Sequence, residues 1–313
     1  MGNEFKKVFI RSMGFYALRI FTVISAAIPL KINYFIGRFM GKIGYICSGR
    51  HRKVAMENLA VAFPEKSVED RKNIVRKFFI FMAQGSLELI HVLSHPAYFM
   101  NTRIEGRANL DAALANKKGV LLVTAHLGNF PLMMSKLASE GYPINIVARP
   151  MRDAKAGDHL FRMREEANVK TISALPRKDC VNGIIKALRD NELVVILMDH
   201  NFGTSGVWVK FFGKLAATPT GPITLAIRTG AALVPAYICR EGNAAHCVRI
   251  MPAQELVIKP DKDETILVNV IKFTRLIEGW IRQSPEQWGW NHRRWKSQPE
   301  PEDFERTFQV EKD

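Results

Sequence analysis

From about residue 104 onward, short apolar runs alternate with segments of helical pattern. The runs 119–124 (GVLLVT) and 193–198 (LVVILM) are almost entirely apolar, which is typical of strands buried on both faces of a sheet. Further strands are expected at 145–149, 232–239 and 247–251, with helices at 129–139, 153–167, 180–190 and about 264–282. This alternation predicts an α/β fold in which helices flank a mixed, partly parallel sheet.

Residues 1–95 have a different, mainly helical pattern. A helix over 51–62 should end before Phe63-Pro64, because proline cannot continue a helix. Ser67, followed three residues later by Asp70, predicts the start of a long helix. We therefore expect an N-terminal helical, membrane-associating region over 1–95 and an α/β domain over 96–313.

The positive charge of the chain is concentrated near its N-terminus. Lys plus Arg outnumber Asp plus Glu by 45 to 30 overall, and residues 1–80 hold 15 basic and 5 acidic side chains. Basic residues interleaved with apolar ones favour an anionic membrane surface as the partner. Charge alone also permits nucleic acid, but no nucleic-acid motif accompanies it, and we expect no such partner.

Two N-terminal segments are candidates for membrane contact. The segment 13–30 is interrupted by Arg19, which would cost about 2.5–3.5 kcal/mol at the bilayer centre. The segment 32–46 places Arg38 and Lys42 among aromatic and aliphatic residues. This pattern favours a helix lying in the membrane interface over one that spans it. Two ordinary core helices are the alternative.

No pattern in the sequence indicates a metal or a cofactor. The four cysteines lack CxxC spacing and do not cluster with histidine, so we expect free thiols and no zinc site. We also expect no cofactor.

Three polar residues follow predicted strands. His126 follows the strand at 119–124, Arg149 ends the one at 145–149, and Asp199 follows the one at 193–198. In open α/β sheets, ligands bind beyond the carboxyl ends of the strands. His126 is therefore a candidate general base, although a single histidine at this position is also compatible with a structural or solvated role.

Motifs along nearly the whole chain carry a resemblance to a known family. They are Asn58-Leu59 with Phe63-Pro64, AHLGNF at 125–130, Arg149-Pro150, the block 198–222 beginning MDHNFG, and QWGWNHRRWK at 287–296. In these motifs the chain resembles the bacterial lipid A late acyltransferases, the lauroyl and myristoyl transferases that acylate lipid A precursors.

The resemblance implies a reaction and a location. His126 would remove a proton from an acceptor hydroxyl, which attacks the thioester of acyl carrier protein or coenzyme A. Asn129 and nearby backbone amides would stabilise the oxyanion. Arg149 would hold a phosphate or the phosphopantetheine of the donor, with a salt bridge at the sheet rim as the alternative. The protein would act at the cytoplasmic face of the bacterial inner membrane.

One position departs from the family pattern. The family motif places Glu or Asp five residues after the histidine, and here that residue is Pro131. Asp199 could supply the carboxylate instead, as a comparable later segment does in the similar mycobacterial mannoside acyltransferases. Alternatively, His126 works poorly alone, or the chain is a non-catalytic lipid-binding homologue. The departure also leaves open another acceptor, such as an ornithine lipid, a lysophospholipid or another glycolipid.

The C-terminal segment 288–296 interleaves three tryptophans with basic residues. Its tail at 291–296 (NHRRWK) could contact membrane phosphates or an acidic carrier protein. Cation–π packing within the fold is the alternative.

Overall fold

The computed structural model describes residues 22–95, 98, 102–151, 153–203, 206–242 and 244–300. Its centre is a seven-stranded sheet with the strand order β1-β9-β8-β2-β5-β3-β4. The strands are β1 (Thr102–Glu105), β2 (Val120–Thr124), β3 (Ile144–Ala148), β4 (Val169–Ser173), β5 (Leu193–Leu197), β8 (Ala232–Arg240) and β9 (His246–Ile250). Neighbouring strands are parallel except β8 and β9, which are antiparallel. The carboxyl ends of β2, β5, β3 and β8 therefore lie at one edge of the sheet.

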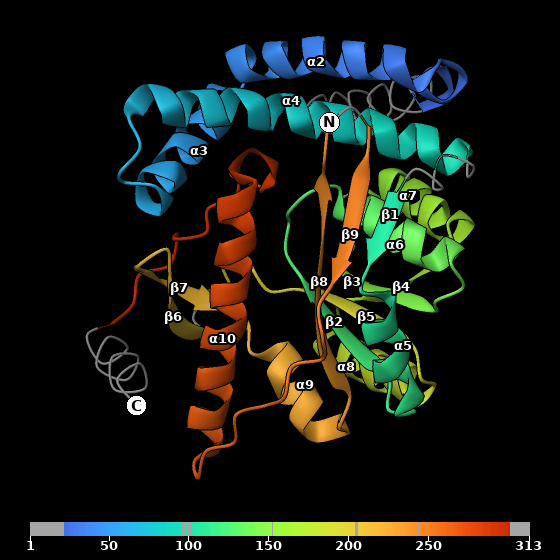
Figure 1. The fold of residues 1–313 in the computed structure, drawn as a ribbon, viewed down its shortest axis with the longest axis vertical. Helices are drawn as coiled ribbons and strands as arrows, with labels where there is room; N and C mark the ends of the chain where they lie inside the picture. The colour runs from blue at the N-terminus through green and yellow to red at the C-terminus, as the bar shows by residue number, and fades with distance from the viewer. Residues whose placement is uncertain are drawn as a thin grey trace, which may run out of the picture.

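Helices cover both faces of this sheet (Figure 1). Successive side chains of β2 point to opposite faces, so Leu121 and Val123 pack in one core while Val120 and Leu122 pack in the other. The first core includes α8 (Arg177–Arg189), α9 (Gly221–Thr229) and α10 (Lys262–Gln283), and the second includes α5 (Arg107–Ala115) and α6 (Phe130–Ser139). All four β2 side chains are fully buried, and each contributes roughly 1.5–3 kcal/mol by burial.

In the N-terminal region, two long helices lie across the edge where β8 ends and β9 begins, and a shorter helix lies to one side of these strands (Figure 1). They are α2 (Leu30–Cys47), α3 (Gly49–Ala62) and α4 (Val68–Ser94), and Ser67 caps α4 by accepting a hydrogen bond from the Asp70 amide. α2 packs directly on α4. The two helices approach so closely at Gly41 that an added Cβ atom there would lie 2.4 Å from the Ile80 Cα. Such close packing of one face of α2 leaves the opposite face in solvent.

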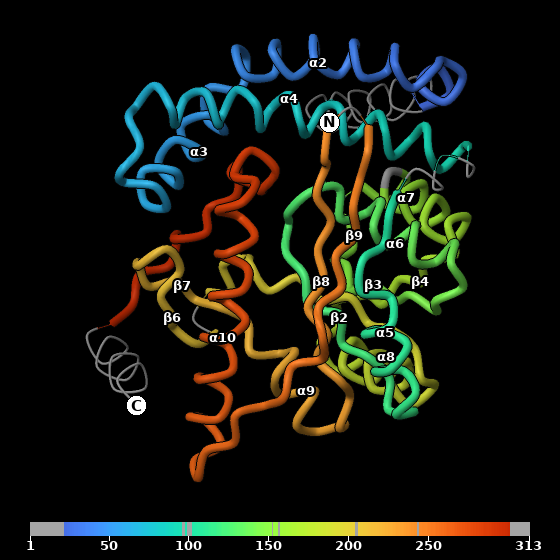
Figure 2. The backbone as a smooth tube through the Cα atoms, in the orientation of Figure 1, coloured from blue at the N-terminus to red at the C-terminus, as the bar shows by residue number. Residues whose placement is uncertain are grey.

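A small hairpin of β6 (Val207–Phe211) and β7 (Lys214–Thr218) lies beside α10 and the C-terminal segment (Figure 2). Trp288, Trp290 and Arg294 of that segment are buried, and the Arg294 guanidinium lies 5.0 Å from the centre of the Phe211 ring. Contact with a membrane or carrier is therefore excluded for these three side chains, which pack within the fold. Arg293 and Lys296 are exposed, and for them such a contact stays a prediction. The helix α7 (Ala154–Glu166) connects β3 to β4, and the 3₁₀ helix η3 (Pro285–Gln287) follows α10.

The predicted α/β architecture with a mixed, partly parallel sheet is confirmed, and the observed sheet is mostly parallel. Each predicted strand agrees with an observed one to within one residue at either end. β1 and β4 were not predicted, because both are edge strands whose side chains are only partly buried. Residues 13–21 of the first candidate membrane segment lie outside the described residues, and none of the described helices is both long and apolar enough to cross a bilayer.

Candidate active site

His126 lies on a tight loop that joins β2 to α6. Gly128 in this loop has a φ of +63°, and a Cβ atom there would lie 1.9 Å from the Ile238 carbonyl oxygen of β8. Only glycine fits this close approach of loop and strand. The loop is thus pressed onto β8 at the carboxyl edge of the sheet.

Residues 287–289, the C-terminal strip, hydrogen-bond to the same loop from its other side. The Gly128 amide donates to the Gln287 carbonyl at 2.9 Å, and the Gly289 amide donates to the His126 carbonyl at 3.0 Å. Leu127 and Trp288 form a β-bridge between these two bonds. The position of the His126 backbone is therefore fixed by residues more than 150 positions later in the chain.

Asp199 lies directly beneath His126. The Met198 amide donates to the Thr124 carbonyl at 3.0 Å, which brings the end of β5 against the end of β2. His126 Nδ1 lies 2.8 Å from Asp199 Oδ1, and the His126 backbone amide donates to Asp199 Oδ2 at 2.8 Å. Trp288 Nε1 donates to the same Oδ2 at 2.7 Å.

These bonds fix the charge and the tautomer of the pair. Burial by itself raises the pKa of Asp199, but the His126 ring and its hydrogen bond together outweigh burial and hold that pKa well below its usual range. An ionised carboxylate can only accept hydrogen bonds, so His126 Nδ1 carries the hydrogen. His126 Nε2 is then the basic nitrogen of the neutral ring.

Two further histidines surround His126. The His200 ring stacks on the His126 ring with centroids 3.7 Å apart, and the His292 ring centre lies 6.1 Å from that of His126. Burial, followed by the proximity of His126, lowers the pKa of His200 to about 4, and burial also lowers the pKa of His292. Both neighbours are therefore neutral near pH 7.

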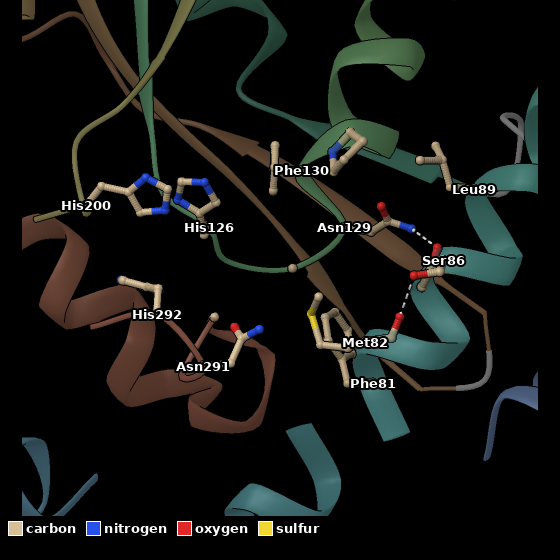
Figure 3. Close-up of a pocket in the computed structure, with 14 residues that line it drawn as sticks. Phe81, Met82, Ser86, Leu89, His126, Asn129, Phe130, His200, Asn291 and His292 are labelled. Carbon is tan, nitrogen blue, oxygen red and sulfur yellow. Dashed lines mark hydrogen bonds between the residues drawn. The ribbon is translucent and has the colours of Figure 1, made fainter. Parts of the chain in front are cut away.

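A cavity of about 250 Å³ opens in front of these rings (Figure 3). Its walls combine the three imidazoles, the loop after β2, the C-terminal strip and apolar side chains of α4 and α6. The lining residues are Phe81, Met82, Gly85, Ser86, Leu89, His126, Gly128, Asn129, Phe130, Pro131, His200, Gly289, Asn291 and His292. The His126 side chain is 24% exposed, whereas the Asp199 side chain is fully buried. His126 can therefore meet a substrate in the cavity, while Asp199 can act only through His126.

Asn129 lines the cavity, but both hydrogens of its side-chain amide are used within the protein. Asn129 Nδ2 donates to the Gly85 carbonyl and to Glu88 Oε2, both at 3.1 Å. Stabilising an oxyanion with this group would require breaking one of these bonds. The predicted substrate-binding role of Asn129 stays a prediction.

Arg149 and Pro131 are placed differently from the His126–Asp199 pair. Arg149 follows β3 at the carboxyl edge and is exposed, with no hydrogen bond or ion pair to another described residue. The rim salt bridge is thus absent among the described residues, and binding of a substrate group stays a prediction.

Pro131 lies in the first turn of α6 and lines the cavity, so an apolar ring occupies the place of the family's carboxylate.

Several residues of the site were not singled out from the sequence. His200 and His292 lie inside the quoted motif blocks, but a histidine beside a motif residue does not by itself indicate a shared cavity. Trp288 was considered only for surface contact or packing, and Glu88 gave no signal, since the partners of both residues are far away in the chain. In the described ranges no group of three or more His, Cys, Asp and Glu residues is arranged to hold a metal ion.

Comparison with known proteins relates the chain to a family. Residues 3–297 match the family described as "Bacterial lipid A biosynthesis acyltransferase". The lipid A biosynthesis lauroyltransferase of Escherichia coli K12 is 31% identical over 277 residues, covering 87% of this chain and 88% of that protein. The palmitoleoyltransferase of the same organism is 26% identical over 282 residues, covering 87% of each chain.

A second group of relatives matches a shorter stretch. The phosphatidylinositol mannoside acyltransferase of Mycobacterium tuberculosis H37Rv is 29% identical over 141 residues, which is 45% of each chain. All of these relatives are named acyltransferases, and the match to the lipid A family covers almost the whole chain. The chain is therefore an acyltransferase that belongs to the bacterial lipid A biosynthesis acyltransferase family.

Proposed function

We propose that this acyltransferase moves a fatty acyl chain from a thioester donor to a hydroxyl group of a membrane glycolipid similar to a lipid A precursor. His126 is the general base, and Asp199 orients it. The observation that carries the proposal is the 2.8 Å contact between His126 Nδ1 and Asp199 Oδ1 at the wall of an apolar cavity.

The pair can perform both proton transfers of the reaction. His126 Nε2 takes the proton of the acceptor hydroxyl as its oxygen attacks the thioester carbonyl carbon. The tetrahedral intermediate then expels the donor's sulfur, which takes the proton from the imidazolium. Asp199 stabilises that imidazolium in between, as the buried acid does in a Ser-His-Asp triad.

The amino end of α6 supports the charge that develops on the carbonyl oxygen. α6 begins at Phe130, and the residues at its start line the cavity. The positive end of a helix dipole stabilises a nearby anion. We assign oxyanion stabilisation to backbone amides here, with the Asn129 side chain as an additional donor only if it leaves Gly85 or Glu88.

Arg149 is the proposed contact for the donor. Its guanidinium is exposed, without a partner among the described residues, at the same sheet edge as His126. Arginine binds phosphate groups through two parallel hydrogen bonds. Acyl carrier protein and coenzyme A both present the phosphate of phosphopantetheine, so either donor fits this contact.

The exposed face of α2 is the proposed membrane contact. Phe35 is 74% exposed, and Phe39 and Ile46 are each more than 60% exposed. Lys31, Arg38 and Lys42 are exposed on the same helix. Apolar side chains beside basic ones suit an anionic lipid surface, and we place the protein at the cytoplasmic face of the inner membrane.

The purified protein tests the reaction. We expect acyl carrier protein thioester to be consumed only when a lipid A precursor is added, with transfer of the acyl chain to that acceptor. Lipids of a strain lacking the gene, measured by mass spectrometry, should then lack one acyl chain on lipid A. Unchanged lipid A in that strain would overturn the acceptor assignment.

Another lipid acceptor is the second candidate, and the similarity to mannoside acyltransferases favours it. The same lipid analysis would reveal it as the loss of an acylated ornithine lipid, lysophospholipid or glycolipid. If no donor is consumed with any acceptor, the chain is a non-catalytic lipid-binding homologue and the proposed function is wrong.

A further inference from the structure

Glu88 of α4 is a buried carboxylate outside the proposed catalytic pair. Its side chain is 2% exposed, and Tyr34 and His246 both donate to Oε1, with His246 Nε2 at 2.7 Å. Oε2 accepts from Asn129 Nδ2 at 3.1 Å and from Arg240 Nη2 at 3.2 Å. One carboxylate therefore joins α2, α4, β8, β9 and the start of α6.

The charge of Glu88 is fully compensated in place. Burial raises its pKa, but the bond and charge of His246, the charge of Arg240 and the bond from Tyr34 together lower the pKa to about 2. The Arg240 side chain is itself only 9% exposed. A buried pair of this kind is costly to disturb, because removing one partner leaves an uncompensated charge.

The hydrogen bonds of Glu88 form a closed ring with the loop that carries His126. Arg240, held by Glu88, exchanges two hydrogen bonds through its backbone with the Gln287 side chain, at 2.8 and 3.0 Å. The Gln287 carbonyl accepts from the Gly128 amide. Asn129, the residue after Gly128, returns to Glu88. Two consecutive loop residues are thus connected to Glu88. Asn129 donates to it directly, and Gly128 is linked to it through Gln287 and Arg240.

We propose that Glu88 is a positioning residue for the His126 loop, acting through Asn129 on one side and through Arg240 and Gln287 on the other. The proposal rests on the proposed function for its catalytic consequence, but not for its structural one. The main role of Asn129 is then to connect the loop to α4, since its two amide hydrogens are already used at Gly85 and Glu88. Tyr34 extends the same connection to α2.

Replacing Glu88 by Gln tests this role with little change of shape. A carboxamide has one oxygen, so its NH₂ group must face either the donors at Oε1 or those at Oε2. We expect kcat for acyl transfer to fall about 10–100-fold with KM within about threefold, because a shift of about 1 Å in a catalytic group has effects of this size. Glu88→Asp, which keeps the charge, should recover part of the loss.

Amide hydrogen exchange tests the positioning without any substrate. The amides of His126 and Gly128 are hydrogen-bonded to Asp199 and Gln287, so their exchange reports opening of the loop. In Glu88→Gln and in Asn129→Ala, a peptide covering 126–130 should exchange at least about 10-fold faster than in the parent protein. Asn129→Ala keeps the Glu88 charge compensated and serves if Glu88→Gln does not fold.

Glu192→Gln is the matched control. Glu192 also accepts a hydrogen bond from an asparagine, Asn145, at 2.8 Å, but it precedes β5 at the opposite edge of the sheet. The Glu192→Gln variant should leave both amide hydrogen exchange at 126–130 and kcat within about twofold of the parent protein.

The outcomes separate the two proposals. Unchanged exchange at 126–130 in both Glu88→Gln and Asn129→Ala would overturn the positioning role, and so would equally fast exchange in Glu192→Gln. A fall in kcat for Asn129→Ala with unchanged exchange would return Asn129 to the oxyanion role. Faster exchange in a protein whose parent form transfers no acyl chain would support the positioning role while the proposed function fails.

Discussion

Asp199 and Glu88 are two buried carboxylates that each hold a histidine. His126 Nδ1 lies 2.8 Å from Asp199, and His246 Nε2 lies 2.7 Å from Glu88. In both cases burial raises the carboxyl pKa, and the charges and hydrogen bonds of neighbouring side chains lower it further than burial raises it. By burial, distance and charge, the two centres are nearly the same.

The two histidines differ in what surrounds the ring nitrogen that does not contact the carboxylate. The His126 side chain is 24% exposed and lines the cavity, whereas the His246 side chain is 2% exposed. His246 Nδ1 is buried without a hydrogen-bond partner in the described structure, so no substrate can reach it. A carboxylate–histidine pair supports catalysis only when the imidazole keeps one nitrogen open to a substrate.

The largest difference is expected between His126→Ala and His246→Ala. His126→Ala removes the proposed general base and should lower kcat at least about 1000-fold. It also leaves the buried Asp199 less compensated, so the unfolding free energy should fall in this variant too. His246→Ala leaves Glu88 less compensated and should cost about 2–4 kcal/mol of unfolding free energy, with kcat per folded molecule within about fivefold. Steady-state kinetics and urea unfolding measure both quantities. Equal losses of kcat in the two variants would abolish the distinction.

Asp199→Asn should have the next largest effect. The asparagine NH₂ group cannot accept the hydrogen of His126 Nδ1 or of Trp288 Nε1, so one of these bonds is lost and the His126 tautomer is no longer fixed. We expect kcat to fall about 100–1000-fold with KM nearly unchanged, measured with acyl carrier protein thioester between pH 6 and 9. Activity within twofold of the parent would remove Asp199 from the proposed mechanism.

The two carboxylates also differ in how far the sequence reveals them. Asp199 follows a strongly apolar run. Its position at the carboxyl edge of the sheet and its proximity to His126 could therefore be predicted from the parallel topology. Glu88 lies in the middle of a long helix, and nothing local distinguishes it from a surface glutamate. Its four partners come from residues 34, 129, 240 and 246, and their meeting depends on how α2 and α4 cross the sheet edge.

The same limit applies to other parts of the molecule. Buried strands carry their signal in a continuous apolar run, whereas the edge strand β4 is only partly buried and mixes polar with apolar residues. Trp288 and Arg294 were open to a surface interpretation, because their burial depends on the β6–β7 hairpin and α10 lying beside the C-terminal segment. Local pattern thus predicts the elements, and long-range packing decides which polar groups they bury.

The stability of the protein should depend on pH through Glu88. Its pKa is lowered from 4.5 to about 2 in the folded state, so its stabilising contribution is complete above about pH 4.5 and is lost as the pH falls towards 2. In Glu88→Gln, the decrease in unfolding free energy between pH 7 and pH 3 should be smaller than in the parent by about 2 kcal/mol. Urea unfolding at both pH values measures it. Glu57→Gln, at an exposed position of α3, should leave the pH dependence as in the parent, and an equal change there would show that Glu88 is not its source.

Arg149 gives the smallest expected effect, because it lies outside both buried centres. Its guanidinium is exposed and makes no hydrogen bond or ion pair with another described residue, so the folded protein loses nothing when it is removed. Arg149→Gln should therefore leave unfolding free energy and kcat unchanged and raise KM for the donor about 3–10-fold, which corresponds to one exposed charge contact with a phosphate. The increase should shrink at high salt, because exposed charges are screened. Arg189→Gln, at the exposed C-terminal end of α8 on the opposite edge of the sheet, is the control. If both variants raise KM equally, the donor responds to the total charge of the protein, and the carboxyl edge of β3 has no specific part in binding it.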